Sequence, residues 1–105
     1  MMMKQSFNRR HSPNRRKTQV KAILHLDDQK MRGCIVDVSY TGMRISVPEN
    51  IPIGTPVMIE MLDVKVPAIV HWSKTRFAGV HLLERLEGET LRALENAHDL
   101  LAAYR

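Results

Sequence analysis

Asp37 and Ser39 stand two residues apart and are followed by Gly42, in the run D-V-S-Y-T-G. Alternate residues of an extended strand project from the same face, so this spacing places a carboxylate beside a hydroxyl. The carboxylate can accept hydrogen bonds from the N–H groups on the edge of a guanine, and the hydroxyl can bond a phosphate or a base. Gly42 lets the backbone turn without a Cβ penalty. The same residues also fit an ordinary hairpin, because Asp and Ser favour turns and Gly closes them.

Two arginine pairs, Arg9–Arg10 and Arg15–Arg16, precede this run. A guanidinium group offers a planar fork that binds phosphate oxygens or the O6 and N7 atoms of guanine, and it can stack on a purine. The first 21 residues carry seven of the 16 basic residues and none of the 11 acidic ones, so the positive charge belongs to this segment. Such a segment indicates an anionic partner, although a solvated tail would have the same composition.

Patterns for catalysis and for metal binding are missing from the sequence. The five histidines are scattered, and there is neither an H-x-x-x-H pair nor a Cys/His cluster, so we expect no metal and no cofactor. Ser39 lacks the G-x-S-x-G context of a nucleophile, and Cys34 is expected on a buried face, where thiols are inert. No glycine-rich phosphate loop is present. We therefore expect a protein that is not an enzyme.

The elements that must position these residues follow a period of two. Residues 1–17 lack periodicity, and we interpret them as a flexible basic arm. Six short segments with alternating apolar residues follow at roughly 10-residue spacing and are joined by short turns. The apolar face of the second segment is expected to consist of Cys34, Val36 and Val38, and Trp72 is expected on the buried face of the fifth. This pattern predicts a small six-stranded antiparallel β-barrel.

The period changes near the end of the chain. Leu91, Leu94, His98 and Leu101 follow helical spacing, which predicts a helix over about residues 89–104 that packs on the barrel. Residues 18–105 are thus expected to form one all-β domain with a C-terminal helix.

The composition favours a cytoplasmic protein. The single cysteine excludes an internal disulfide and fits a reducing compartment. No apolar run approaches the ~20 residues of a membrane span, and no apolar stretch follows the basic start as it would in a signal peptide. We therefore expect neither membrane insertion nor an anchor.

The sequence resembles the PilZ family of cyclic di-GMP receptor domains over about residues 9–83. The resemblance rests on the arginine-rich lead-in and on four later segments: Val36–Ile45, Ile53–Val57, Val70–Trp72 and Gly79–Leu82. In that family, an R-x-x-x-R motif in the lead-in and a [D/N]-x-S-x-x-G motif after the second strand clamp cyclic di-GMP on a six-stranded barrel. Family members act as receptors and adaptors, not as enzymes, in bacterial motility, biofilm formation and cell-cycle control.

The resemblance implies a cyclic di-GMP site built from four arginines of the arm and three residues of the motif: Arg9, Arg10, Arg15, Arg16, Asp37, Ser39 and Gly42. The arginines would grip guanine and phosphate groups, the carboxylate and the hydroxyl would read guanine edges, and the glycine would allow a close approach. Ligand binding would order the arm against the barrel, and an unidentified effector protein would receive the signal.

The arginine spacing departs from the family pattern. No two arginines of the arm stand at R-x-x-x-R spacing, and the nearest fit, Arg10 with Arg15, is one residue too long. A flexible arm can absorb that residue, which keeps the receptor hypothesis. The alternative is a PilZ-fold protein-interaction adaptor that does not bind the nucleotide. RNA binding through the arm is a third hypothesis, but the few aromatic residues form no stacking platform, so we do not expect a nucleic-acid partner.

Overall fold

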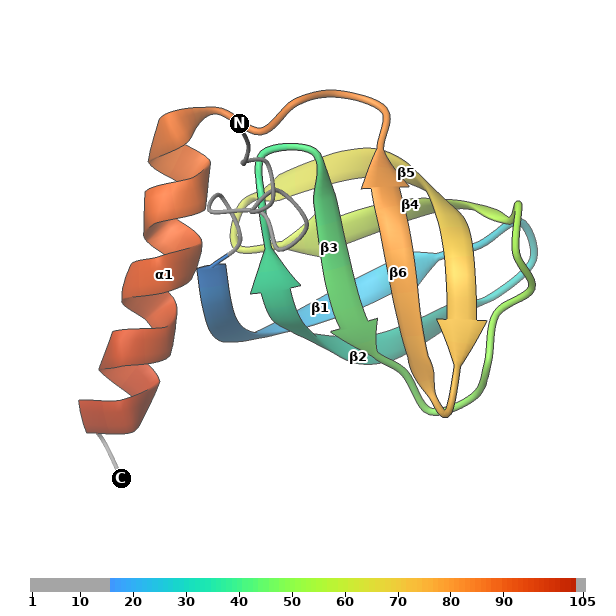
Figure 1. Cartoon of the computed structure of the whole chain (residues 1–105), viewed down its shortest axis with the longest axis horizontal. Helices are drawn as coiled ribbons and strands as arrows, with labels where there is room; N and C mark the ends of the chain where they lie inside the picture. The colour runs from blue at the N-terminus through green and yellow to red at the C-terminus, as the bar shows by residue number, and fades with distance from the viewer. Residues whose placement is uncertain (1–15, 104–105) are drawn as a thin grey trace, which may run out of the picture.

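A computed structural model describes residues 16–103 (Figure 1). Six strands and one helix follow one another in this part of the chain: β1 (Arg16–His25), β2 (Lys30–Val38), β3 (Gly42–Ser46), β4 (Pro56–Met61), β5 (Val64–Lys74), β6 (Phe77–Leu82) and α1 (Gly88–Ala103). The strands close into a barrel in the order β1-β2-β3-β6-β5-β4, and every neighbouring pair is antiparallel. The predicted fold class, a six-stranded antiparallel barrel with a C-terminal helix, is confirmed.

Side chains from alternate residues of the strands fill the inside of the barrel and form the core. Leu24, Ile35, Ile45, Ile59 and Val70 come from five different strands and are all fully buried. Each such side chain stabilises the fold by roughly 1.5–3 kcal/mol relative to leaving it in water. The alternation predicted from the sequence holds along β1, β3 and β4, where the inward-facing residues are the expected ones.

A register shift in β2 changes which residues are buried: of the predicted face, Val38 is buried as expected, whereas Val36 and Cys34 are only partly buried. Ile35 pairs with Ile45, but Asp37 pairs with Arg44, so β2 carries one extra residue at this point. An extra residue of this kind is a β-bulge, and it changes the phase of the alternation. The expectation that Cys34 lies on a buried face was therefore wrong, because Cys34 is half-buried on the outside while Ile35 faces the core.

A second register shift removes Trp72 from the core. Val70 pairs with Val80, whereas Trp72 pairs with Gly79, so β5 also carries one extra residue. The sequence pattern placed Trp72 on the buried face, and that expectation was wrong. Its indole lies on the outside over Gly79, where an added Cβ would fall within 2.5 Å of three indole atoms. A glycine is therefore needed here because the ring occupies the space of a side chain.

Helix α1 lies against one end of the barrel, beside the beginning of β1 (Figure 1). Leu91 and Leu94 are buried, and the hydroxyl of Thr18 donates a hydrogen bond of 2.5 Å to the carbonyl oxygen of Leu94. Glu89 in the first turn suits the positive end of the helix dipole. Within residues 16–103, no helix combines the length and the apolarity needed to cross a membrane.

The start of β1 bears on the predicted arm. Arg16 and Lys17, the last two residues that the sequence pattern assigned to the arm, are the first two residues of β1. Residues 1–15, with Arg9, Arg10 and Arg15, lie outside the described part of the chain. Their interpretation as a flexible arm stays a prediction.

Candidate functional site

One row of cross-strand partners crosses five strands of the barrel. Lys17 of β1 pairs with Asp37 of β2, Asp37 with Arg44 of β3, Arg44 with Gly79 of β6, and Gly79 with Trp72 of β5. Directly paired residues project from the same face of a sheet, here the outer one. The chain that precedes β1 is therefore joined to the barrel next to the carboxylate of the D-x-S-x-x-G motif.

Asp37 is held by an ion pair. Nη2 of Arg44 lies 2.8 Å from Oδ2 of Asp37, and the Asp37 side chain is only 12% exposed. The guanidinium of Arg44 also lies over the ring of Phe77, 5.4 Å from its centroid. A carboxylate oxygen has more than one lone-pair site, so Asp37 can keep this partner and still accept from an N–H group of a ligand. Arg44 thus orients the carboxylate in the outer row.

Ser39 and Gly42 build the turn between β2 and β3. The Ser39 hydroxyl oxygen accepts hydrogen bonds from the backbone N–H groups of Thr41, at 3.3 Å, and Gly42, at 3.1 Å. Its own hydrogen makes only a long contact of 3.4 Å to the Gly42 carbonyl. Toward a ligand, the hydroxyl can therefore act chiefly as a donor, for example to a phosphate oxygen.

Gly42 allows a close approach to β6. A Cβ at this position would lie 3.1 Å from the carbonyl oxygen of Val80, which is tighter than ordinary van der Waals contact. Gly54 is the one described glycine with a positive φ, so the requirement for glycine at position 42 comes from crowding and not from a left-handed backbone.

A hollow of about 270 Å³ opens beside the turn. The motif residues Asp37, Ser39 and Gly42 all line it, together with His71 and Trp72 of β5. This volume lies near the lower end of the roughly 300–1,000 Å³ typical of ligand pockets, so it suits one part of a large ligand. Among the described residues, no group of three or more His, Cys, Asp or Glu side chains is placed to hold a metal ion.

Arg16 does not line this hollow. Its Nε atom lies 3.2 Å from Oε2 of Glu95 on α1, and both side chains are about one-third exposed. The structure thus brings Asp37, Ser39 and Gly42 together and pairs Arg16 with the helix, while the other three arginines of the predicted set lie outside residues 16–103.

The sequence reasoning missed four residues of this region: Lys17, Arg44, His71 and Trp72. A signal for Arg44 was available, since it follows Gly42 by two residues and therefore shares its face of β3. No such signal existed for Trp72, because the register shift that exposes it depends on pairing with β6.

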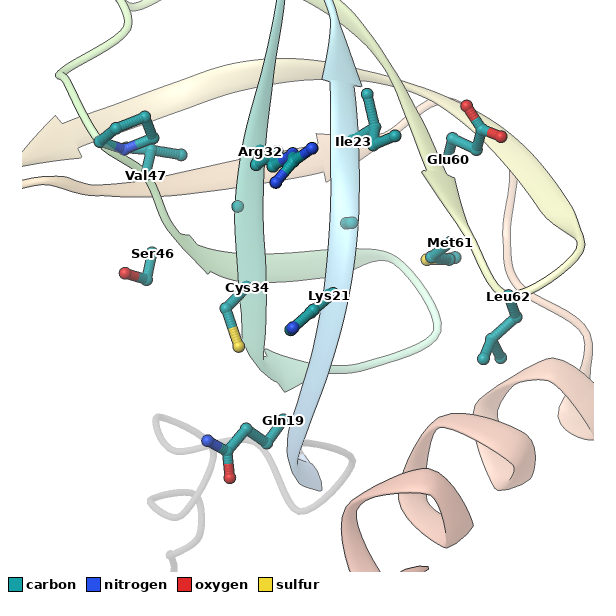
Figure 2. Close-up of a pocket in the computed structure, with 13 residues that line it drawn as sticks. Gln19, Lys21, Ile23, Arg32, Cys34, Ser46, Val47, Glu60, Met61 and Leu62 are labelled. Atoms are coloured by element: carbon teal, nitrogen blue, oxygen red, sulfur yellow. The ribbon is translucent and has the colours of Figure 1, made fainter. Parts of the chain in front are cut away.

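The barrel carries a larger hollow elsewhere, of about 910 Å³, over β1 and β2 (Figure 2). It shares no lining residue with the hollow at the motif. We take the smaller hollow as the candidate site, because it is lined by the three motif residues Asp37, Ser39 and Gly42, whereas the larger one is not.

A family comparison agrees with this geometry. The family model of the PilZ domain matches residues 8–97, a span that includes the arginine-rich segment, the D-x-S-x-x-G turn, all six strands and most of α1. None of the curated proteins matches the chain. With the barrel, the motif and the match over most of its length, the chain belongs to the PilZ domain family.

Proposed function

We propose that this protein is a cyclic di-GMP receptor that orders its arginine-rich arm on the ligand and passes the signal to a separate effector protein. PilZ domains form a receptor family for this dinucleotide and are generally not enzymes. We propose the same for this chain, acting in the bacterial cytoplasm in control of motility or biofilm formation. The observation that carries the proposal is the outer row that joins the end of the arm to Asp37.

Guanine recognition falls to Asp37 and Ser39 in this proposal. The carboxylate accepts from the N1–H and N2–H₂ groups of one guanine, and Arg44 holds it in place from the other side. The hollow that these residues line has room for one part of the dinucleotide, not for the whole of it. The remainder of the ligand would be covered by the arm.

The arm supplies the cations that the motif lacks. Arg9, Arg10, Arg15 and Arg16 would pair with the two phosphates and with the O6 and N7 edge of guanine. Because Arg16 is paired with Glu95, it would have to exchange a carboxylate for the ligand. Phosphate pairing contributes much of such an affinity, so binding would weaken as salt is added.

Signal transfer can use the contacts between the motif and α1. The backbone N–H of Leu86 donates to the carbonyl of Tyr40 within the turn, at 2.9 Å, and the guanidinium of Arg85 lies 4.2 Å from the centroid of the Tyr40 ring. Both residues belong to the segment that leads into α1. A ligand that moves the turn or recruits Arg16 therefore acts on two of the contacts that hold the helix and the segment leading into it.

A second candidate function is a PilZ-fold adaptor that does not bind the nucleotide. The Arg16–Glu95 pair favours it, because this arginine already has a partner. The absence of an R-x-x-x-R pair in the arm points in the same direction. In this case, α1 and the barrel would serve only for contact with proteins.

Isothermal titration calorimetry with cyclic di-GMP, beside GTP as a control, separates the two functions. The receptor predicts saturable binding that is selective for the dinucleotide. Replacing Arg15→Ala together with Arg16→Ala should weaken it at least about tenfold, since a charge-assisted hydrogen bond contributes roughly 1.5–3 kcal/mol. The matched control, Arg76→Ala with Arg92→Ala, removes the same charge from exposed positions outside the hollow. Unchanged affinity in the Arg15/Arg16 variant would refute the assignment of these arginines, and no heat in the folded wild type would leave the adaptor.

A further inference from the structure

The larger hollow lies over the outer face of the β1–β2 ribbon and is flanked by the ends of β3 and β4 (Figure 2). Lys21 pairs directly with Cys34, and Ile23 with Arg32, so these four side chains share the outer face. Its lining extends from Ser46, after which the chain leaves β3, to Leu62 beyond β4. Because this hollow extends over several strands, it is an open groove that could hold an extended polypeptide segment, and not an enclosed cavity.

The groove carries more positive than negative charge. Lys21 and Arg32 are both exposed, and neither of them takes part in an ion pair with the side chains of residues 16–97, which the structure describes. Glu60 is the single acidic residue of the lining, and its carboxylate lies 2.8 Å from Nε2 of His25. Two cations therefore face the groove against one carboxylate, and this net positive charge indicates an anionic partner.

Apolar side chains, with the polar Gln19 and Ser46, form the rest of the groove lining. Leu62 is 48% exposed in the turn after β4, and Ile23 is partly buried on β1. None of the lining residues is aromatic. Single-stranded nucleic acids need aromatic side chains on which their bases stack, whereas acidic protein segments with apolar residues need a surface that is both cationic and apolar. The composition of the groove thus favours a protein partner.

We propose that this groove docks an acidic segment of the effector protein, with apolar side chains interspersed among its carboxylates. Carboxylates of the segment would pair with Lys21 and Arg32, and its apolar residues would pack on Ile23 and Leu62. The proposal rests on the adaptor role within the proposed function. It does not require the nucleotide to be bound, since the groove and the nucleotide site share no residue.

Cys34 gives a native reporter for this test. It is the single cysteine of the chain, it is half-buried, and it lines the groove beside Lys21. We would measure the rate of its reaction with a chromogenic disulfide reagent in the absence of nucleotide. The probe is a synthetic peptide of glutamate and leucine residues in amphipathic order. One control peptide has serine in place of leucine, and the other has lysine in place of glutamate.

The glutamate–leucine peptide should slow the modification of Cys34 several-fold, and the protection should weaken as salt is added. Neither control peptide should protect. Replacing Lys21→Glu together with Arg32→Glu should weaken the peptide's apparent affinity at least about tenfold, which corresponds to roughly 1.4 kcal/mol. The matched variant, Lys74→Glu with Arg92→Glu, makes the same charge change at exposed positions outside the groove and should leave the protection intact.

Three results would overturn the proposal: no protection at millimolar peptide, equal loss in both charge-reversed variants, or stronger protection by single-stranded RNA than by the peptide. The last result would make the groove a nucleic-acid surface. Calorimetry with cyclic di-GMP on the Lys21→Glu/Arg32→Glu variant separates this question from the receptor function. Retained nucleotide binding with lost peptide protection supports two independent sites, while loss of both in a variant with an unchanged Tm would contradict a groove separate from the nucleotide site.

Discussion

Replacing Gly79→Ala tests how the outer row is packed. The new Cβ would fall within 2.5 Å of three atoms of the Trp72 indole, whereas ordinary contact begins at 3.4 Å. The ring therefore has to move outward by about 1 Å or more, or β3 and β5 have to part from β6. Trp72 lines the hollow beside Asp37, so the same change should disturb the candidate site.

The cost follows from overpacking, which typically destabilises a protein by roughly 1–3 kcal/mol. In a domain of this size, 1 kcal/mol shifts the Tm by roughly 4–8 °C. We therefore expect Gly79→Ala to lower the Tm by between roughly 4 and 24 °C.

Calorimetric melting and tryptophan fluorescence check this together, since Trp72 is the single tryptophan of the chain. The emission of the variant should shift to the red as the indole moves toward water. The control is Gly88→Ala, whose Cβ would meet its nearest atom, the Tyr40 hydroxyl oxygen, at an ordinary 3.8 Å. An unchanged Tm and an unchanged emission spectrum in Gly79→Ala would refute the packing of Trp72 over Gly79.

Two further predictions concern the helix and the far end of β4. Thr18→Val removes the buried hydrogen bond to the carbonyl of Leu94 and should destabilise the fold by about 1 kcal/mol. Amide hydrogen exchange in α1 should become faster than in the wild type, and by more than exchange in the barrel does. Equal exchange rates of α1 in the variant and the wild type would contradict the contact. The hydrogen bond from His25 holds the pKa of Glu60 below its ordinary value of 4.5. The folded state therefore favours the ionised carboxylate, so this stabilisation is present above pH 4.5 and is lost as the pH falls through the lower folded pKa. In Glu60→Gln, denaturant unfolding between about pH 5 and 3 should depend less on pH than in the wild type, and identical profiles would show that the pair contributes nothing.

The local alternation of apolar residues was enough to predict the barrel, but it did not predict which side chains lie on the outer face near the two register shifts. Along β1, β3 and β4, the pattern of every second apolar residue has one reading, and burial confirmed it. At Cys34 and Trp72, the local pattern pointed inward, yet both lie outside. An extra residue in a strand leaves no mark in that strand's own sequence, because it is defined by the partner that pairs with it.

In the candidate site, too, the residues brought together by local sequence were predictable, and those brought together by strand pairing or by the helix were not. The spacing of Asp37, Ser39 and Gly42 placed three motif residues together, since their proximity depends only on one strand and one turn. Arg44 required knowledge of the register between β2 and β3, although its position after the motif offered a hint. The Arg16–Glu95 pair joins residues from opposite ends of the described chain, and no local pattern could have indicated it.

The most direct test of the receptor function is a ¹⁵N NMR titration of the full chain with cyclic di-GMP. We expect saturable shifts at the amides of Asp37, Ser39 and Gly42 and at Trp72, together with new or shifted signals from the arm. Amides of the distant groove, such as Ile23 and Arg32, should stay in place. Shifts centred on that groove, or none at all in the folded protein, would contradict the account.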